Sequence, residues 1–480
     1  MKTRKLFVLP AICCALALTL GACGDEKQEN AKAEAEAKAK AEAEAKAKAE
    51  AVEKAKLIFS EDGKTITGVK DKGIKSVVIP NGVTSVGNRA FEDCSKLTSV
   101  TIGNGVTSIG GSAFSRCTSL TSITIPSSVT SIGDYAFWDC SKLTSVTIGN
   151  GVTSIGERAF WGVKSVQVAA GNPVFSVAEG GVLINKKEKK LLYVPCSLSG
   201  SYTIPDSVTS IENGAFRYCS SLTSVTIPDS VTSIGKEAFK DCSSLTSITI
   251  PDSVTSIGDS AFSWCSSLTS ITIGNGVTSI GDWAFAHCSK LPSVTIPDSV
   301  TSIGNHAFNG CKSLTSVTIP SSVTSIGKEA FASCSKLTSV VIPDSVKSIG
   351  AHAFSSCSSL TSVTIGNGVT SIGAHAFSYC KSLTSITIPD SVTSIRNHAF
   401  NGCYNLTSVT IPDSVTSIGD YAFWDCTSLT SITIPDSVTS IGNGAFDDCS
   451  SLKRLTIPAK FTDENVKRWD VPSNCKIIRR

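Results

Sequence analysis

Apolar positions recur with a 23-residue period along most of this chain. The dipeptide Ala-Phe marks the period, and every step between successive copies spans one period except for a single jump from Phe160 to Phe216. One unit, residues 222–244, reads LTSVTIPDSVTSIGKEAFKDCSS. A unit this short cannot bury its apolar positions alone, so the period predicts coils that stack and merge their apolar edges into one core.

The pattern inside the unit predicts three short elements per coil. Val225 and Ile227 alternate with Ser224 and Thr226, as in a strand with one buried face. A second short strand is expected around Val231–Ile234, and a helical turn around Glu237–Cys242. The predicted fold class is therefore a mainly β repeat solenoid of 23-residue coils, with a single spine of phenylalanine rings.

The repeat motifs resemble those of a known family. L-T-S-[VI]-T-I-P, V-T-S-I-G and A-F-x-x-C are similar to the repeats of BspA-type leucine-rich repeat proteins of bacterial surfaces, and the resemblance covers about Val77 to Pro458. It implies a leucine-rich repeat solenoid over residues 77–458. It also implies a non-enzymatic surface protein that adheres to host matrix proteins or to other cells.

The repeat is interrupted once and flanked by atypical ends. Residues 163–203 carry two apolar runs joined by a basic cluster, which predicts a hairpin projecting from one oversized coil. It is either a docking protrusion or a neutral insertion. Residues 57–76 and 459–480 are predicted to cap the stack, because open ends would expose core and strand edges.

The N-terminal segment, residues 1–56, is predicted to contain a targeting signal followed by a spacer. Residues 1–22 combine basic residues with an apolar run from Leu6 to Leu20, which is typical of a signal peptide and too short to span a bilayer. Leu20 to Cys23 resembles a bacterial lipobox, which implies lipidation of Cys23; an ordinary leader with a chance cysteine is the alternative. Residues 23–56 form the predicted spacer, in which Ala31 to Lys56 is a low-complexity run of Ala with Lys or Glu. These good helix formers predict a helix with Glu–Lys pairs such as Glu34–Lys38, and a frayed, solvated linker is the alternative.

Composition narrows the function classes. The net charge is +3, and three basic residues of the leader account for it, so no basic field for nucleic acid remains. No Gly-rich phosphate loop, zinc-protease helix or nucleophile elbow occurs, and the abundant Ser and Asp are copies of one word rather than a unique constellation. We therefore expect no enzyme, no cofactor and no nucleic-acid partner.

Cysteine and histidine form columns in the stack. Fourteen of the 19 cysteines lie three residues after a repeat Phe, which favours buried thiols over scattered disulfides or a metal site. Cys196 and Cys475 fall outside that column. His352, His375 and His398 lie two residues before Phe in successive coils, where they could bind a metal, respond to acid or simply be copies. The overall prediction is no metal site.

Aromatic residues at the variable positions around Ala-Phe are the candidate binding residues, since such rings suit protein or glycan contact. They are Tyr135, Trp138, Tyr218, Trp264, Trp283, Tyr379, Tyr404, Tyr421 and Trp424. The expected function is a lipid-anchored rod at the bacterial cell envelope, in the outer membrane and facing outward, that binds extracellular protein. A glycan-capture lipoprotein and a structural spacer without a ligand remain alternatives, as does a repetitive polymer, or ice, on the uniform hydroxyl face of the strands.

Overall fold

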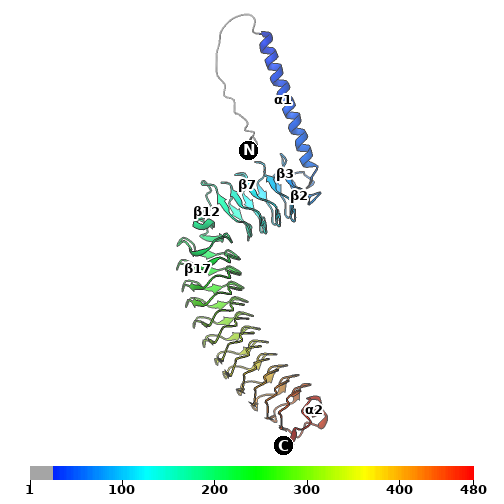
Figure 1. The fold of residues 1–480 in the computed structure, drawn as a ribbon, viewed down its shortest axis with the longest axis vertical. Helices are drawn as coiled ribbons and strands as arrows, with labels where there is room; N and C mark the ends of the chain where they lie inside the picture. Colours follow the sequence, from blue (N-terminus) through cyan, green and yellow to red (C-terminus); the bar gives the residue numbers. More distant parts are fainter. Residues whose placement is uncertain (1–24) are drawn as a thin grey trace, which may run out of the picture. The chain divides into compact units, whose positions relative to one another are not determined.

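The computed structural model describes residues 25–480, with side chains from residue 31 onward, and divides into two units at Lys56. Residues 1–22 and Cys23 lie outside the described residues. Helix α1 (Asp25–Lys54) has 30 residues and would measure about 45 Å at the usual helical rise. The helix itself is as predicted (Figure 1). Its side chains from residue 31 onward are exposed nearly all round. The expected pairs such as Glu34–Lys38 do not close, whereas Glu50–Lys54 and Glu53–Lys56 do.

The second unit, Leu57–Arg480, is the predicted solenoid, in which each coil gives one strand to each of two ribbons (Figure 1). The first ribbon contains β3 (Ser76–Val78), β5 (Ser99–Thr101), β7 (Ser122–Ile125), β9 (Ser145–Ile148), β11 (Val166–Val168), β15 (Gly200–Thr203), β17 (Leu222–Thr226), β19 (Ser247–Ile250), β21 (Ser270–Ile273), β23 (Ser293–Thr295), β25 (Ser316–Thr318), β27 (Ser339–Ile342), β29 (Ser362–Ile365), β31 (Ser385–Thr387), β33 (Ser408–Thr410), β35 (Ser431–Thr433), β37 (Arg454–Ile457) and β38 (Lys476–Arg479).

The second ribbon is built mostly from two-residue strands. It begins with β1 (Leu57–Phe59) and β2 (Thr65–Val69) and continues with β4 (Ser85–Val86), β6 (Ser108–Ile109), β8 (Ser131–Ile132) and β10 (Ser154–Ile155). Beyond the insertion it contains β16 (Ser210–Ile211), β18 (Ser233–Ile234), β20 (Ser256–Ile257), β22 (Ser279–Ile280), β24 (Ser302–Ile303), β26 (Ser325–Ile326), β28 (Ser348–Ile349), β30 (Ser371–Ile372), β32 (Ser394–Ile395), β34 (Ser417–Ile418) and β36 (Ser440–Ile441).

Successive coils pair in parallel and in register, so each residue lies beside its copy in the next coil. Ser247, for example, pairs with Ser270, and Ser256 pairs with Ser279. The second ribbon is continuous over 14 strands from β12 to β36, whereas the first ribbon breaks into smaller sheets over the same coils.

The Ala-Phe segment forms a run of hydrogen-bonded turns in place of the expected helical turn. Amides alternate between two partners: Cys94 N donates to Phe91 O within the coil, while Phe91 N donates to Ala113 O of the next coil. This alternation requires two residues with left-handed backbone in every coil, at Phe−2 and Phe+2, where φ lies between 52° and 86°. We call the surface formed by the residues from Phe−2 to Phe+2 the turn edge.

The interior confirms the phenylalanine spine but divides it into two runs. Neighbouring rings stack with centroids 4.6 to 5.9 Å apart, from Phe91 to Phe160 and again from Phe216 to Phe446. Two hydrophobic clusters correspond to these runs. The prediction of one unbroken spine is wrong at the insertion, because the inserted strands separate the two cores.

The insertion contains β12 (Phe175–Ala178), the 3₁₀ turn η1 (Glu179–Gly181), β13 (Val182–Asn185) and β14 (Lys190–Tyr193). β13 and β14 form the predicted antiparallel hairpin. The hairpin does not project, since β13 is buried along its whole length, with Leu183 in the N-terminal core and Val182 in the C-terminal core. Only its tip, residues 186–189, is fully exposed. We call residues 163–203 the seam.

Both ends of the solenoid are covered. At the N-terminal end β1 pairs antiparallel with β2. At the C-terminal end helix α2 (Asp463–Arg468) leads into Trp469, which is 2% exposed and donates its indole Nε1 to Ile441 O at 3.2 Å, while β38 extends the first ribbon. These segments cover strand edges that would otherwise pair with another chain.

Candidate binding surface

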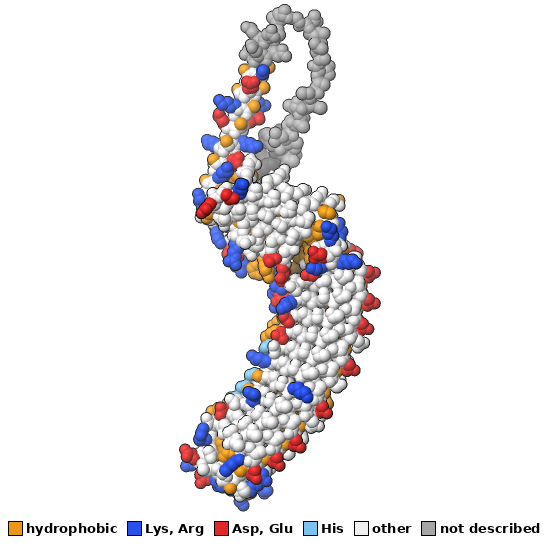
Figure 2. Space-filling model, turned by 180° about the vertical axis from the view of Figure 1, so that it is seen from behind, with side chains coloured by type: hydrophobic (Ala, Val, Ile, Leu, Met, Phe, Trp, Pro, Cys, Tyr) orange, Lys and Arg blue, Asp and Glu red, His pale blue; other side chains and the backbone are white. Residues whose placement is uncertain are grey.

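All nine predicted aromatic residues lie on the turn edge or one position beyond the cysteine column. Five have exposed side chains, and Trp264 is the most exposed at 49%. These five are Tyr218, Trp264, Trp283, Tyr379 and Tyr421, while Tyr135, Trp138, Tyr404 and Trp424 are half-buried. Figure 2 shows histidine and hydrophobic side chains along one margin of the C-terminal coils, and Asp and Glu along the opposite margin.

The stack turns the Phe−2 column into a ladder of rings. His352, His375 and His398 lie parallel, with centroids 4.3 and 4.4 Å apart and planes within 7°. Tyr421 continues the ladder 5.1 Å beyond His398, and Trp424 meets it edge-on. Burial, together with the neighbouring imidazoles, lowers the pKa of His375 to about 4. His375 is therefore neutral at neutral pH.

The histidine column does not form a metal site. Parallel imidazoles direct their nitrogens into parallel planes, so their lone pairs do not converge on one ion. No group of three His, Cys, Asp or Glu residues suited to a metal occurs among residues that the structure describes. The stacked geometry of His352, His375 and His398 therefore gives the metal interpretation no support.

Many ring faces on the turn edge are covered by the adjacent coils. Trp264 stacks on His287 at 4.1 Å, and Trp283 stacks on His306 at 3.8 Å. Tyr421 lies between His398 and Gly444, where an added Cβ would come within 2.4 Å of the ring. Tyr379 lies over Gly402 in the same way. One face of Trp264, Trp283 and Tyr379 is covered in this way, whereas Tyr421 has neighbours on both faces.

A second aromatic group lies beside the seam and includes Trp161, which the sequence analysis missed. Trp138 stacks on Trp161 at 5.2 Å, and the Arg116 guanidinium lies 5.0 Å from the centre of the Trp138 ring. Trp161 also meets Tyr218 at 5.4 Å across the seam. The sequence could have identified Trp161, because it directly follows a repeat Phe, as Trp138 and Trp424 do.

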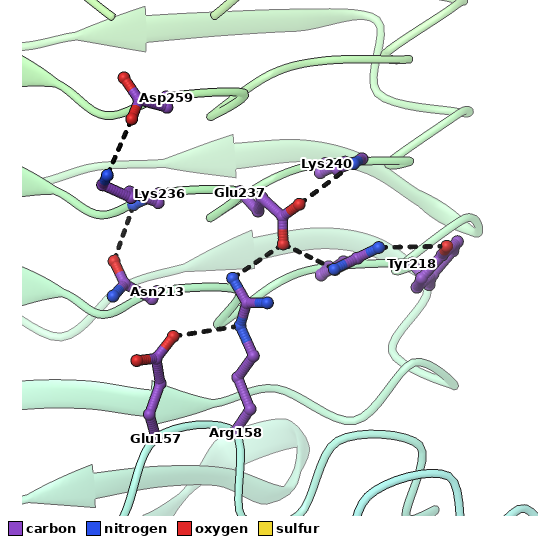
Figure 3. Close-up of polar contacts among 9 residues, drawn as sticks. Glu157, Arg158, Asn213, Tyr218, Lys236, Glu237, Lys240 and Asp259 are labelled. Atoms are coloured by element: carbon purple, nitrogen blue, oxygen red, sulfur yellow. Dashed lines mark hydrogen bonds and ion pairs between the residues drawn. The ribbon is translucent and has the colours of Figure 1, made fainter. Parts of the chain in front are cut away.

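An ion cluster joins the two sides of the seam at this point (Figure 3). Glu237 accepts Arg158 at 2.7 Å, Arg217 at 2.6 Å and Lys240 at 3.1 Å. Burial raises the pKa of Glu237, but the three cations outweigh it and hold that pKa below its usual value. Arg217 also lies over the rings of Trp161 and Tyr218. Arg158 passes Gly214 to reach Glu237, since an added Cβ there would meet Arg158 Nε at 3.1 Å.

The remaining predicted binding residues differ in their contacts. Tyr404 and Trp424 have polar partners, whereas the side chain of Tyr135 has none within the part of the chain that the structure describes. Lys381 Nζ lies 5.6 Å from the Tyr404 ring, which pairs its hydroxyl with Asp425. Trp424 donates Nε1 to Asp448 at 3.2 Å. Tyr135 makes no ring stack among the described residues and lines a shallow groove along the second ribbon. The nine residues are thus spread along the edge rather than gathered into one pocket.

The cysteine column is internal and chemically quiet. Its fourteen thiols are buried and free, and each that follows another column cysteine donates to a Phe carbonyl of the preceding coil, as Cys311 does to Phe285 at 3.2 Å. Burial raises the pKa of Cys311 to about 12, so the thiol stays protonated at neutral pH. Cys196 and Cys475 are half-buried, and burial raises the pKa of each.

In many coils the threonine that precedes the exposed serine of the first-ribbon strand is used for bonds between coils. Thr246 Oγ1 donates to Thr223 O, and Thr269 Oγ1 donates to Thr246 O, both at 3.1 Å. The remaining hydroxyls do not form one even lattice, because the first ribbon is divided into separate sheets. This geometry disfavours a ligand that needs constant spacing, such as ice or a rigid polymer.

Comparison with known proteins identifies the class. Residues 69–178, 189–291, 278–407 and 370–478 match the model of the BspA type leucine-rich repeat region. The chain therefore belongs to the BspA-type leucine-rich repeat family. A search of curated proteins found no match. This family has a fold that is generally non-enzymatic, which favours a binding role.

Two solved structures illustrate the likeness. A leucine-rich repeat protein from Bacteroides ovatus is 29% identical, with a TM-score of 0.53, covering 88% of this chain and 97% of its own. A leucine rich cell surface protein from Faecalibacterium prausnitzii is 27% identical, with a TM-score of 0.38, covering 87% of this chain and 96% of its own.

Within residues 25–480, neither helix has the length and apolar character needed to cross a bilayer.

Proposed function

We propose that this chain is a non-enzymatic binding protein of the bacterial surface, which attaches to extracellular proteins through the turn edge. The observation that carries this proposal is the gathering of exposed rings on that edge, from Trp264 to Tyr421. Aromatic residues at the centre of an interface contribute much of its binding energy. Many weak contacts along one rod add up when both partners are held at surfaces.

Protein contact fits the rings better than glycan capture. Stacking on a sugar requires a free ring face, and Trp138 and Tyr421 each have neighbours on both faces. Ring edges and hydroxyls remain available for packing against side chains of a protein partner. A spacer without a ligand would leave the exposed rings without a role.

The proposed location follows from the N-terminal residues. Lipidation of Cys23 would anchor the chain in the bacterial envelope, most simply in the outer membrane, and α1 would hold the solenoid away from the lipid. Radioactive palmitate should label the wild-type protein and not Cys23→Ser. Protease added to intact cells should digest the solenoid, and a fully protected protein would contradict surface exposure.

A binding panel tests the function itself. The full-length chain should bind at least one immobilised matrix protein, such as fibronectin or fibrinogen, or a component of another cell's surface, in a saturable way. The same preparation on a glycan array should give no saturable signal. Binding to glycans alone would support the capture alternative, and silence on both would support the spacer.

A further inference from the structure

The seam exposes a strand edge in the middle of the solenoid. β10 ends the six-stranded part of the second ribbon, and no strand pairs with its far side. Ile155 is half-buried, whereas the matching residue of every other short strand is buried except Ile441 beside the C-terminal cap. β10 thus resembles the end of a solenoid, although eleven further Ala-Phe coils follow it.

Backbone groups along this edge lack the partners that they have elsewhere. In the preceding coil Thr130 O accepts Thr153 N and Ile132 O accepts Gly156 N, both at 2.8 Å. Thr153 O and Ile155 O accept no hydrogen bond from any residue in the described range 25–480. The N–H and C=O of one strand residue point to the same side, so Ile155 N–H also lies at the free edge. The edge presents acceptor, donor and acceptor in order.

Carbonyls close to this edge find hydrogen-bond donors among the described residues, whereas Thr153 O and Ile155 O do not. Buried Asn172 donates its Nδ2 to Gly149 O at 2.9 Å and to Val152 O at 3.0 Å, while its Oδ1 accepts two amides of the insertion. At the C-terminal end Trp469 Nε1 serves Ile441 O, the counterpart of Ile155 O. The counterpart of Ile155 O at the C-terminal end is thus served from within the chain, whereas Ile155 O itself is served by no described residue.

A cavity of about 220 Å³ lies against this edge. Ile155, Phe175 and Leu192 supply its apolar wall. Three carboxylates, Glu157, Glu188 and Glu212, face two cations, Arg158 and Lys190. Arg158 pairs with both Glu157 and Glu237, and Lys190 pairs with Glu188, so Glu212 is the one cavity carboxylate that makes no ion pair with a described residue.

Glu212 marks this cavity as a departure from the repeat. It occupies the corner position that is glycine in nearly every other coil, where a Cβ would meet the preceding backbone, as at Gly235 with a contact of 2.7 Å. Glu212 has room because the preceding coil is replaced here by the hairpin, and its N–H donates to Leu191 O at 3.0 Å. Its carboxylate accepts Ser210 Oγ at 2.8 Å on the cavity wall.

We propose that the seam cavity is a docking slot for an extended peptide segment of a protein partner, which pairs its backbone with β10 and places a lysine or arginine beside Glu212. The row of acceptor, donor and acceptor matches the backbone of an extended peptide, which is how strand addition gives affinity. The Glu212 carboxylate selects the basic side chain. This inference rests on the proposed protein-binding function and names part of the partner.

The test uses a random heptapeptide display library selected on the full-length chain. Selected peptides should carry a basic residue, and N-methylation of the amides that face Thr153 O and Ile155 O should weaken binding at least tenfold. Ser154→Trp, which fills the slot, should abolish binding, and Glu212→Lys should weaken it at least tenfold. Ser348→Trp places the same side chain at an exposed matching position far from the seam and should bind as wild type.

The outcomes separate this inference from the function on which it rests. No selected peptide, or peptides indifferent both to Ser154→Trp and to N-methylation, would overturn the slot. If the full-length chain still bound a matrix protein through the turn edge, the proposed function would stand without it. Failure of both the peptide selection and the protein panel would overturn both.

Discussion

Single residues decide how closely the coils can approach. In the Gly-Asn-Gly motifs glycine replaces proline at the end of the first strand, and in some coils the preceding coil leaves no space there for a side chain. An added Cβ at Gly274 would lie 2.5 Å from Pro251 C, whereas at the matching Gly103 the nearest atom is 3.6 Å away. One repeat position is therefore strict in one coil and tolerant in another.

Gly274→Ala should destabilise the solenoid by about 1–3 kcal/mol, because the new methyl group forces the backbones apart. Gly103→Ala is the matched control and should be nearly neutral. Urea unfolding of the two variants measures the difference. Equal midpoints for both would contradict the packing described for this column.

Histidine stacking predicts a local response to acid. The pKa of His375 falls to about 4 in the fold, below its usual 6.5, so the unfolded chain binds the proton more readily. Stability should therefore be complete above about pH 6.5 and decline as the pH falls toward 4, by on the order of 1 kcal/mol after solvent screening. His375→Asn should flatten this part of the pH profile of thermal unfolding, and an unchanged slope would contradict the stacked, neutral ladder.

Elements that copy the repeat were predictable, while the turn edge and the seam were not. The strand positions, the Phe spine and the buried cysteines follow from alternation and period, because each coil meets a copy of itself. The left-handed residues did not follow, since Tyr, His, Trp and Asp occupy them as well as Gly. Glycine at Phe−2 or Phe+2 in five coils, and never at Phe+1, was the available signal.

The sequence analysis could not predict which aromatic ring faces are covered by the adjacent coil, for a related reason. Whether a face is free depends on which residue the next coil places over it, as Gly402 is placed over Tyr379. The seam had no period from which to reason, so its hairpin was predicted as an element but its burial was not. Buried Asn172, which joins the seam to the N-terminal core, gave no pattern in the sequence.

Asn172→Ala should cost at least about 2 kcal/mol, because two carbonyls and two amides lose a buried partner. Hydrogen exchange should quicken first at the seam. Asn150→Ala changes an exposed asparagine of the neighbouring coil and should leave both stability and exchange unaltered. If protection from hydrogen exchange were lost only in the C-terminal coils, the role given to Asn172 would be contradicted.

At the largest scale, residues 57–480 form one solenoid with exposed rings along its turn edge. Its interior is apolar, and burial raises the pKa of the column thiols such as Cys311, which fits the binding role that we propose. The turn edge from Trp264 to Tyr421 spans eight successive coils, and separate coils can bind separate parts of a partner. Weak contacts in series would then make the loss of several rings more damaging than the loss of any one.

The most direct measurement compares the affinity of two multiple variants for the matrix protein that the panel identifies. The first combines Trp264→Ala, Trp283→Ala, Tyr379→Ala and Tyr421→Ala on the turn edge; the control combines Thr249→Ala, Thr272→Ala, Thr295→Ala and Thr318→Ala on the exposed face of the first ribbon. With both variants folded by circular dichroism, we expect the first to bind at least a hundredfold more weakly than wild type and the control to bind as wild type. Equal affinity of the two variants would contradict binding through the turn edge.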